Sequence, residues 1–133
     1  MKRTSIKVQG LGHGGAPTPT ASLVGPLLVS GSISGVNPET GEVPPGINAQ
    51  TELIFRNIGM VMAAAGGSIE DIVKLTFFAR DRSVRPAIDD EWVRTFPDEE
   101  NRPSRHLVIS DIPPAVDLQC EIMAFLETVA GRW

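Results

Sequence analysis

The chain has 133 residues, 41% of them hydrophobic, one cysteine and a formal net charge of −4 at pH 7. This length suits one domain, 1–133, with its own core, and the acidic balance argues against nucleic acid or an anionic membrane surface as a partner. We expect a cytoplasmic protein, because there is no apolar run near the ~20 residues that span a bilayer, no signal peptide and no second cysteine for a disulfide.

The first third of the chain is predicted to hold strands joined by loops. Residues 1–8 can form a short strand, and the glycine- and proline-rich segment 9–22 is a loop. Two apolar stretches, 23–25 and 26–34, meet at a Gly-Pro pair and predict a hairpin. Residues 35–46 contain Asn-Pro and Thr-Gly-Glu, which are typical of turns.

A helix is predicted between Asn48 and Ala65, because apolar residues recur there every three or four positions. Asn48 can cap it by accepting a hydrogen bond from a free backbone N–H, and the glycine pair that follows Ala65 can end it. Asn57 lies off the apolar stripe, on the expected polar side. The stripe consists of Ile54, Ile58, Val61 or Met62, and Ala65.

A strand and a second helix are predicted next. Ser68, with Asp71 three residues later, begins a short helical turn. Residues 72–80 are rich in β-branched and aromatic side chains and predict a largely buried strand. Ser83 is the expected cap of the second helix. The apolar stripe of this helix is Val84, Ile88, Trp92 and Phe96.

Two strands, about 105–111 and 116–126, end the pattern and are separated by Pro113-Pro114. The element order is therefore β-β-β-α-β-α-β-β. We predict an α+β fold in which both helices cover one face of a mixed sheet. The chain offers no further element for the other face, so we expect a homo-oligomer that buries it.

Polar residues of the last strand are candidates for chemistry. Strand alternation places Cys120 on the core side and Gln119 and Glu121 on the other face. Glu121 is thus a mid-strand carboxylate. It serves either as an ordinary surface acid or as a general base beside a pocket.

Arg105 opens the preceding strand. If the last two strands pair through the Pro-Pro turn, Arg105 can lie near Gln119 and Glu121. It can then form a salt bridge, or its planar guanidinium can bind a substrate carboxylate.

The two histidines are further candidates. His106 points to the opposite face from Arg105, and His13 in the glycine-rich loop can reach a pocket. The spacing of histidines, cysteine and acids does not fit a metal site.

Five segments in the same order resemble the RidA/YjgF family of enamine/imine deaminases and related small-molecule binders. They are "LLVSGSISGVNPETGEVP", "NAQTELIFRNI", "AAAGGSIEDIVKLTFFARD", "RPSRHLVISDIP" and "CEIMAF". The resemblance implies a single RidA-like domain with a chorismate-mutase-like fold. It also implies a homotrimer whose sheets face inward, active sites between subunits, and no metal or other cofactor.

The resemblance also implies substrate-binding residues. Arg105 matches the family arginine that binds the substrate carboxylate. Ser30 matches a pocket serine and has Gly31 beside it, and Asp89 falls where relatives have a pocket asparagine.

Two departures from the family pattern concern catalysis. Gln119 occupies the place of the acid that positions the attacking water, and Glu121 matches a second acid. The N-terminal loop lacks the Gly-Pro-Tyr-Ser motif, since the chain contains no tyrosine. These departures resemble the 2-aminomuconate-deaminase branch of the family.

Three functions follow as hypotheses. The first is hydrolytic deamination of a small carboxylate-bearing enamine or imine, with Glu121 or His13 as general base. The second is a binding protein for small carboxylates in which Gln119 has removed the chemistry. The third is RNA cleavage by His13 and His106, which the missing basic surface disfavours.

Overall fold

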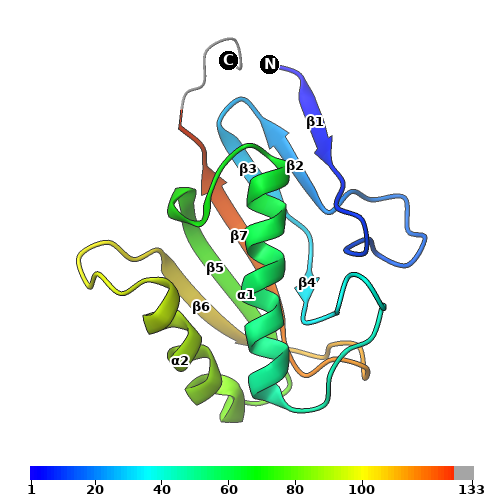
Figure 1. The fold of residues 1–133 in the computed structure, drawn as a ribbon, viewed down its shortest axis with the longest axis vertical. Coiled ribbons are helices and arrows are strands. Elements are labelled where there is room, and N and C mark those ends of the chain that lie inside the picture. Colours follow the sequence, from blue (N-terminus) through cyan, green and yellow to red (C-terminus); the bar gives the residue numbers. More distant parts are fainter. Residues whose placement is uncertain (128–133) are drawn as a thin grey trace.

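The computed structural model describes residues 1–127 and consists of one mixed sheet with two helices on one face (Figure 1). The strand order is β1-β2-β3-β7-β5-β6, and β4 also pairs with β7. The elements are β1 Arg3–Ile6, β2 Ala21–Val24, β3 Leu27–Ser30, β4 Ile33–Ser34, α1 Ile47–Ala64, β5 Ile72–Ala79, α2 Arg85–Thr95, β6 Ser104–Ile109 and β7 Gln119–Phe125. Within residues 1–127, no helix is both long and apolar enough to cross a membrane.

The predicted α+β class and element order are confirmed, with two refinements. The strand β2 already begins at Ala21, so the last two residues of the predicted loop 9–22 pair with β1 and β3 instead. The second arm of the predicted hairpin is divided into β3 and β4, because Gly31 and Ser32 leave the ladder. β3 pairs with the last part of β7, and β4 pairs with its first two residues.

The last two strands are not neighbours, contrary to the pairing considered from the Pro-Pro turn. β5 lies between them, parallel to β6 and antiparallel to β7. The reason is the α2 crossover, because a strand–helix–strand unit returns a parallel strand to the same sheet. The segment after β6 then carries the chain past β5 to its other side.

The core lies between α1 and the sheet. The predicted stripe is buried, and Asn57, which we expected on the polar side, is buried as well. Its Nδ2 donates hydrogen bonds to the carbonyl oxygens of Ser34 and Val36, both 2.9 Å away. Asn57 therefore ties the segment around β4 to α1, which a packed polar side chain can do when its donors are satisfied.

Two predicted caps are wrong, and one is confirmed. α1 begins at Ile47 with Gly46 before it, so Asn48 already lies within the helix. Asp81, and not Ser83, caps the short 3₁₀ turn that leads into α2, accepting the backbone N–H of Ser83. Gly46 therefore sets the start of α1, and the 3₁₀ turn Arg82–Val84 sets the start of α2. The third predicted cap is confirmed, because the short 3₁₀ helix Ile69–Asp71 has a capping box between Ser68 and Asp71.

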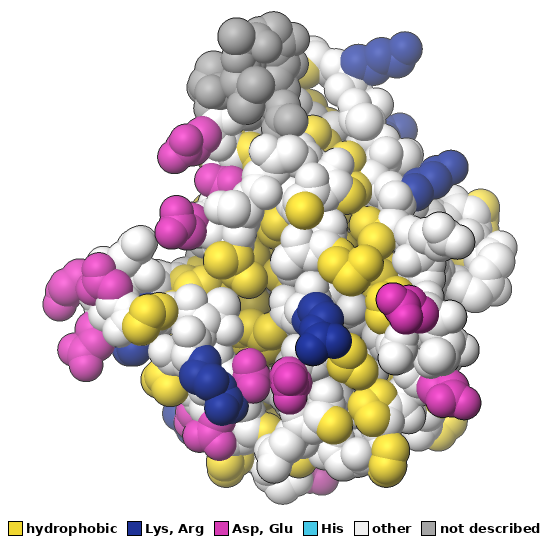
Figure 2. All heavy atoms as spheres, viewed as in Figure 1, with side chains coloured by type: hydrophobic (Ala, Val, Ile, Leu, Met, Phe, Trp, Pro, Cys, Tyr) yellow, Lys and Arg dark blue, Asp and Glu magenta, His cyan; other side chains and the backbone are white. Residues whose placement is uncertain are grey.

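The sheet face opposite the helices, which we call the open face, is partly apolar. Pairing and alternation place Gln119 and Glu121 on it. Five large hydrophobic side chains on its β2–β3–β7 part are between 37% and 60% exposed. They are Val24, Leu27, Val29, Met123 and Phe125. On the helix side of the molecule, acidic and basic side chains lie among hydrophobic ones (Figure 2).

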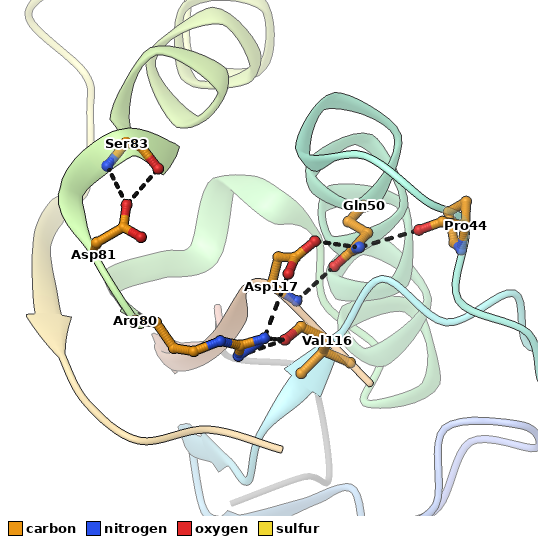
Figure 3. Close-up of polar contacts among 7 residues, drawn as sticks. All are labelled: Pro44, Gln50, Arg80, Asp81, Ser83, Val116 and Asp117. Carbon is orange, nitrogen blue, oxygen red and sulfur yellow. Dashed lines mark hydrogen bonds and ion pairs between the residues drawn. The ribbon is translucent and has the colours of Figure 1, made fainter. Parts of the chain in front are cut away.

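A hydrogen-bonded junction anchors the chain just before β7 (Figure 3). The buried amide of Gln50 donates to Asp117 Oδ2 and to the Pro44 carbonyl, both at 3.0 Å, and accepts the backbone N–H of Asp117 at 2.9 Å. Arg80 binds the Val116 carbonyl through both terminal nitrogens. The junction thus holds the segment that leads into Gln119 and Glu121.

Candidate functional site

Arg105 lies on β6, the edge strand, and faces the helices. It pairs with Leu75 in the ladder, and its guanidinium lies over the Trp92 ring, 5.0 Å from the ring centroid. It also forms an ion pair with Asp89 of α2. Its side chain is only 22% exposed. α2 therefore orients the guanidinium through one aromatic face and one carboxylate.

A cavity of about 270 Å³ opens beside this arginine. It is smaller than the roughly 300–1,000 Å³ sites of drug-sized ligands, which suits a small metabolite. Its lining contains three arginines in an otherwise acidic protein. The lining residues are Arg82, Arg85, Ile88, Arg105, His106 and Leu107.

Arg105 does not lie beside Gln119 and Glu121 within one protomer, as the assumed β6–β7 pairing suggested. β5 separates β6 from β7. Arg105 pairs with Leu75 of β5, whose side chain faces the helices, whereas Glu121 pairs with Thr76, whose side chain lies on the open face. The salt bridge considered with Glu121 is instead made with Asp89. Asp89, a predicted binding residue, is therefore a direct partner of Arg105.

Ser30, Gly31 and His13 are brought together where β3 ends. The Ser30 hydroxyl accepts the backbone N–H of Ile122 at 2.9 Å and donates to the Gly31 carbonyl at 2.8 Å. His13 Nε2 lies 3.0 Å from the Ser32 carbonyl oxygen, and its other ring nitrogen contacts Thr18. The glycine-rich loop is thus tied to the bend between β3 and β4.

Gly31 lies directly against the imidazole of His13. A Cβ atom on Gly31 would lie only 3.0 Å from His13 Cε1. A side chain at this position would therefore push the imidazole away from the bend. The register on either side of the bend places it opposite Glu121 and Ile122 of β7.

Glu121 shares a row of polar side chains on the open face with two neighbours. It pairs with Thr76 of β5, which in turn pairs with His106 of β6. Glu121 is exposed, and Gln119 lies two residues before it on the same face. His106 faces away from Arg105, as alternation predicted, but borders the same cavity because β6 is the edge strand.

Cys120 belongs to the core, as predicted, and is fully buried between the sheet and α1. Burial raises the pKa of its thiol well above the ordinary value, and the nearby charge of Glu121 raises the pKa further. A thiol kept protonated in this way is a poor nucleophile.

Sequence reasoning missed three residues at this site. Trp92 was assigned to the core alone, although its ring also supports Arg105. Arg82 and Arg85 were not singled out. The sequence did offer one signal for these two arginines. They are three residues apart at the start of a helix, and residues with that spacing lie on the same helix face.

Comparisons with known proteins agree with this architecture. The family model described as "Endoribonuclease L-PSP" matches residues 21–126. A "RutC family protein" of Haemophilus influenzae is 38% identical over 101 residues, 74% of this chain and 77% of that protein. The "Putative reactive intermediate deaminase TdcF" of Escherichia coli strain K12 is 32% identical over 100 residues, which cover 74% of this chain and 77% of that protein.

Two solved structures share the fold over almost the whole chain. The crystal structure of E. coli TdcF with bound serine has a TM-score of 0.83 at 26% identity and covers 93% of this chain and 99% of its own. The YjgF gene product of E. coli has a TM-score of 0.81, also at 26% identity, and covers 92% of this chain and 98% of its own. The chain therefore belongs to the endoribonuclease L-PSP family, which is the RidA/YjgF family that its sequence motifs resemble.

Proposed function

We propose that this protein is a hydrolytic deaminase of small enamines or imines that carry a carboxylate, releasing ammonia without a metal. The observation that carries the proposal is Arg105, which Trp92 and Asp89 hold at the border of a small cavity. A guanidinium has five N–H donors, so Arg105 keeps donors for a substrate carboxylate beside its bond to Asp89. The relative named a reactive intermediate deaminase supports the same chemistry.

The proposed site is completed by a second copy of the chain. Arg105 and Asp89 belong to the helix side of the sheet, whereas Glu121 and Gln119 lie on the open face. One protomer therefore cannot present both groups to one small substrate. We propose a homotrimer in which the apolar part of the open face is buried and the edge strand of one subunit meets the open face of the next.

The reaction begins with tautomerisation of the enamine to the imine, and water then adds to the C=N carbon. Arg105 binds the carboxylate and draws electron density from the reacting carbon as the transition state forms. Glu121 or His13 takes a proton from the water as the water oxygen bonds to the carbon, and returns that proton to the imine nitrogen, which gives a carbinolamine. The hydroxyl proton of the carbinolamine is then passed to the amine nitrogen as the C–N bond breaks, so that ammonia leaves and the carbonyl forms. Gln119 can orient the water by hydrogen bonding. Ser30 and Gly31 shape the wall next to His13.

The substrate is proposed to resemble 2-aminomuconate more than a small 2-imino acid. The N-terminal loop lacks the family tyrosine, and Gln119 replaces the first acid of the last strand. The bound serine in the TdcF structure is an amino acid, and an amino acid carries the carboxylate that Arg105 would recognise.

The test is a coupled ammonia-release assay on 2-aminomuconate and on 2-iminopropanoate. Arg105→Ala should weaken carboxylate binding by about 2–5 kcal/mol if the pair forms in a desolvated cleft, and Arg105→Lys should weaken it less because the charge remains. Glu121→Gln should lower turnover by roughly 10²-fold with binding retained. If His13→Ala causes that loss instead, His13 is the base.

A binding protein for small carboxylates is the second candidate. It is favoured by Gln119, because an amide cannot accept a proton from water near neutral pH. Under this alternative the wild-type chain binds a 2-oxo acid through Arg105 but releases no ammonia from either substrate. Calorimetric titration and the ammonia assay on the same preparation separate the two functions.

A further inference from the structure

We infer that the cavity beside Arg105 holds a second anionic group of the substrate, and that Arg82 and Arg85 recognise it. The inference rests on the proposed function, since it concerns the same site. It restricts the substrate to a class, namely imines or enamines with a second carboxylate at the far end of the carbon chain.

The first argument is the charge of the cavity lining. Arg82, Arg85 and Arg105 line one cavity of about 270 Å³. The cavity lining is therefore positively charged, although the chain as a whole has a formal net charge of −4. Like charges gathered around a small cavity repel one another, and an anion bound among them relieves that repulsion.

The second argument concerns the acids near these arginines. Asp89 is engaged by Arg105, and the carboxylate of Asp81 accepts hydrogen bonds from the backbone and side chain of Ser83. Within residues 1–127, Arg82 and Arg85 form no ion pair and no side-chain hydrogen bond. Their donors are therefore available to a ligand.

The third argument is the contrast with the other arginines near α2. Arg80 points to the Val116 carbonyl and Asp117, and Arg94 pairs with Glu91. Arg102 donates to the Phe96 carbonyl. Those three have structural partners, whereas Arg82 and Arg85 have none among residues 1–127. A planar guanidinium suits two-point binding of a carboxylate.

The experiment compares two ligands of equal carbon number that cannot be deaminated. 2-Oxoglutarate carries the second carboxylate, and 2-oxopentanoate lacks it. In calorimetric titrations at low salt, we expect wild type to bind 2-oxoglutarate roughly tenfold more tightly, in keeping with one charged hydrogen-bonded contact. The Arg82→Gln/Arg85→Gln double variant should lose this preference while its affinity for 2-oxopentanoate stays unchanged.

Two further variants make the result specific. Arg94→Gln removes an exposed arginine of the same helix that borders a different cavity, so it should keep the preference. Arg105→Gln should weaken both ligands alike. Equal affinity of wild type for the two ligands, or a preference that survives in the double variant, would overturn the inference.

The titrations and the ammonia-release assay together separate this inference from the proposed function. If wild type prefers 2-oxoglutarate but deaminates no imine, the anion site stands and the deaminase proposal fails. If wild type deaminates imines with one and two carboxylates equally well, and the double variant does the same, the deaminase proposal stands and the second anion site fails.

Discussion

The ion pair between Arg105 and Asp89 determines how freely the arginine can hold a substrate. Trp92 fixes the plane of the guanidinium, and Asp89 occupies part of its hydrogen-bonding fork. An asparagine in place of Asp89 would keep an oxygen acceptor without the charge. In the proposed site, the substrate carboxylate would therefore share the guanidinium with the carboxylate of Asp89.

Replacing Asp89 should reveal this competition. In Asp89→Asn, the guanidinium loses a charged partner worth up to about 1 kcal/mol at a partly exposed site. We expect 2-oxo acids to bind up to about fivefold more tightly, as measured by calorimetric titration. Asp90→Asn, which removes the adjacent acid at a different cavity, should leave affinity unchanged. Weaker binding in Asp89→Asn would contradict this prediction, because it would show that the orienting effect of Asp89 on Arg105 outweighs its competition with the ligand.

Cys120 should be chemically silent in the folded protein. Burial, followed by the charge of Glu121, raises the pKa of the thiol, so it stays protonated at pH 8, where an exposed thiol begins to ionise. We expect reaction with a thiol reagent only after unfolding. Glu121→Gln should leave the native thiol unreactive, because burial is the larger cause. Rapid labelling of the native protein at pH 8 would contradict the core assignment.

Among the elements, α1 and the segment after β4 approach each other at Gly35. A Cβ atom there would overlap the backbone carbonyl of Gln50 and lie 2.7 Å from its Cα. Gln50 is also the centre of the junction with Asp117. Gly35 therefore lets the chain pass close to the first turns of α1 while that junction forms.

A pair of glycine substitutions tests this close approach. Gly35→Ala should lower the free energy of unfolding by about 1–3 kcal/mol, because backbone atoms must move apart. Gly59→Ala, within α1 and with no neighbouring atom within 4 Å of the added Cβ, should raise it by about 0.8–1 kcal/mol through helix propensity. Urea denaturation measures both. Equal effects of the two changes would show that the approach at Gly35 is not tight.

The whole molecule leaves one sheet face partly apolar, and the proposed trimer buries it. Val29 lies on this open face and is 42% exposed, whereas Val93 of α2 is 51% exposed on the helix side. The two valines are alike in type and exposure. They differ in the surface to which they belong.

Val29→Glu should dissociate the assembly, because a buried charge without a partner is strongly unfavourable. Light scattering should give three times the mass of one chain for wild type and for Val93→Glu, and a smaller mass for Val29→Glu. Ammonia release should fall with the mass, since each proposed site needs two subunits. A wild-type mass equal to that of one chain would refute the trimer.

The sequence alone determined the elements and the sides on which most of their side chains lie, although it did not predict the burial of Asn57. Periodicity identified both helices, and alternation placed Cys120 in the core and Glu121 on the opposite face. It also separated His106 from Arg105. These properties are local, because the repeats of a helix and a strand follow from backbone geometry within a few residues.

Tertiary structure alone decided which residues meet. Local patterns do not reveal that β5 lies between β6 and β7, so they could not predict that Arg105 faces Asp89 and Trp92 instead of Glu121. Nor could they show that Arg82 and Arg85 border the cavity of Arg105. Strand order depends on how a whole crossover packs on the sheet, which is a property of contacts distant in sequence.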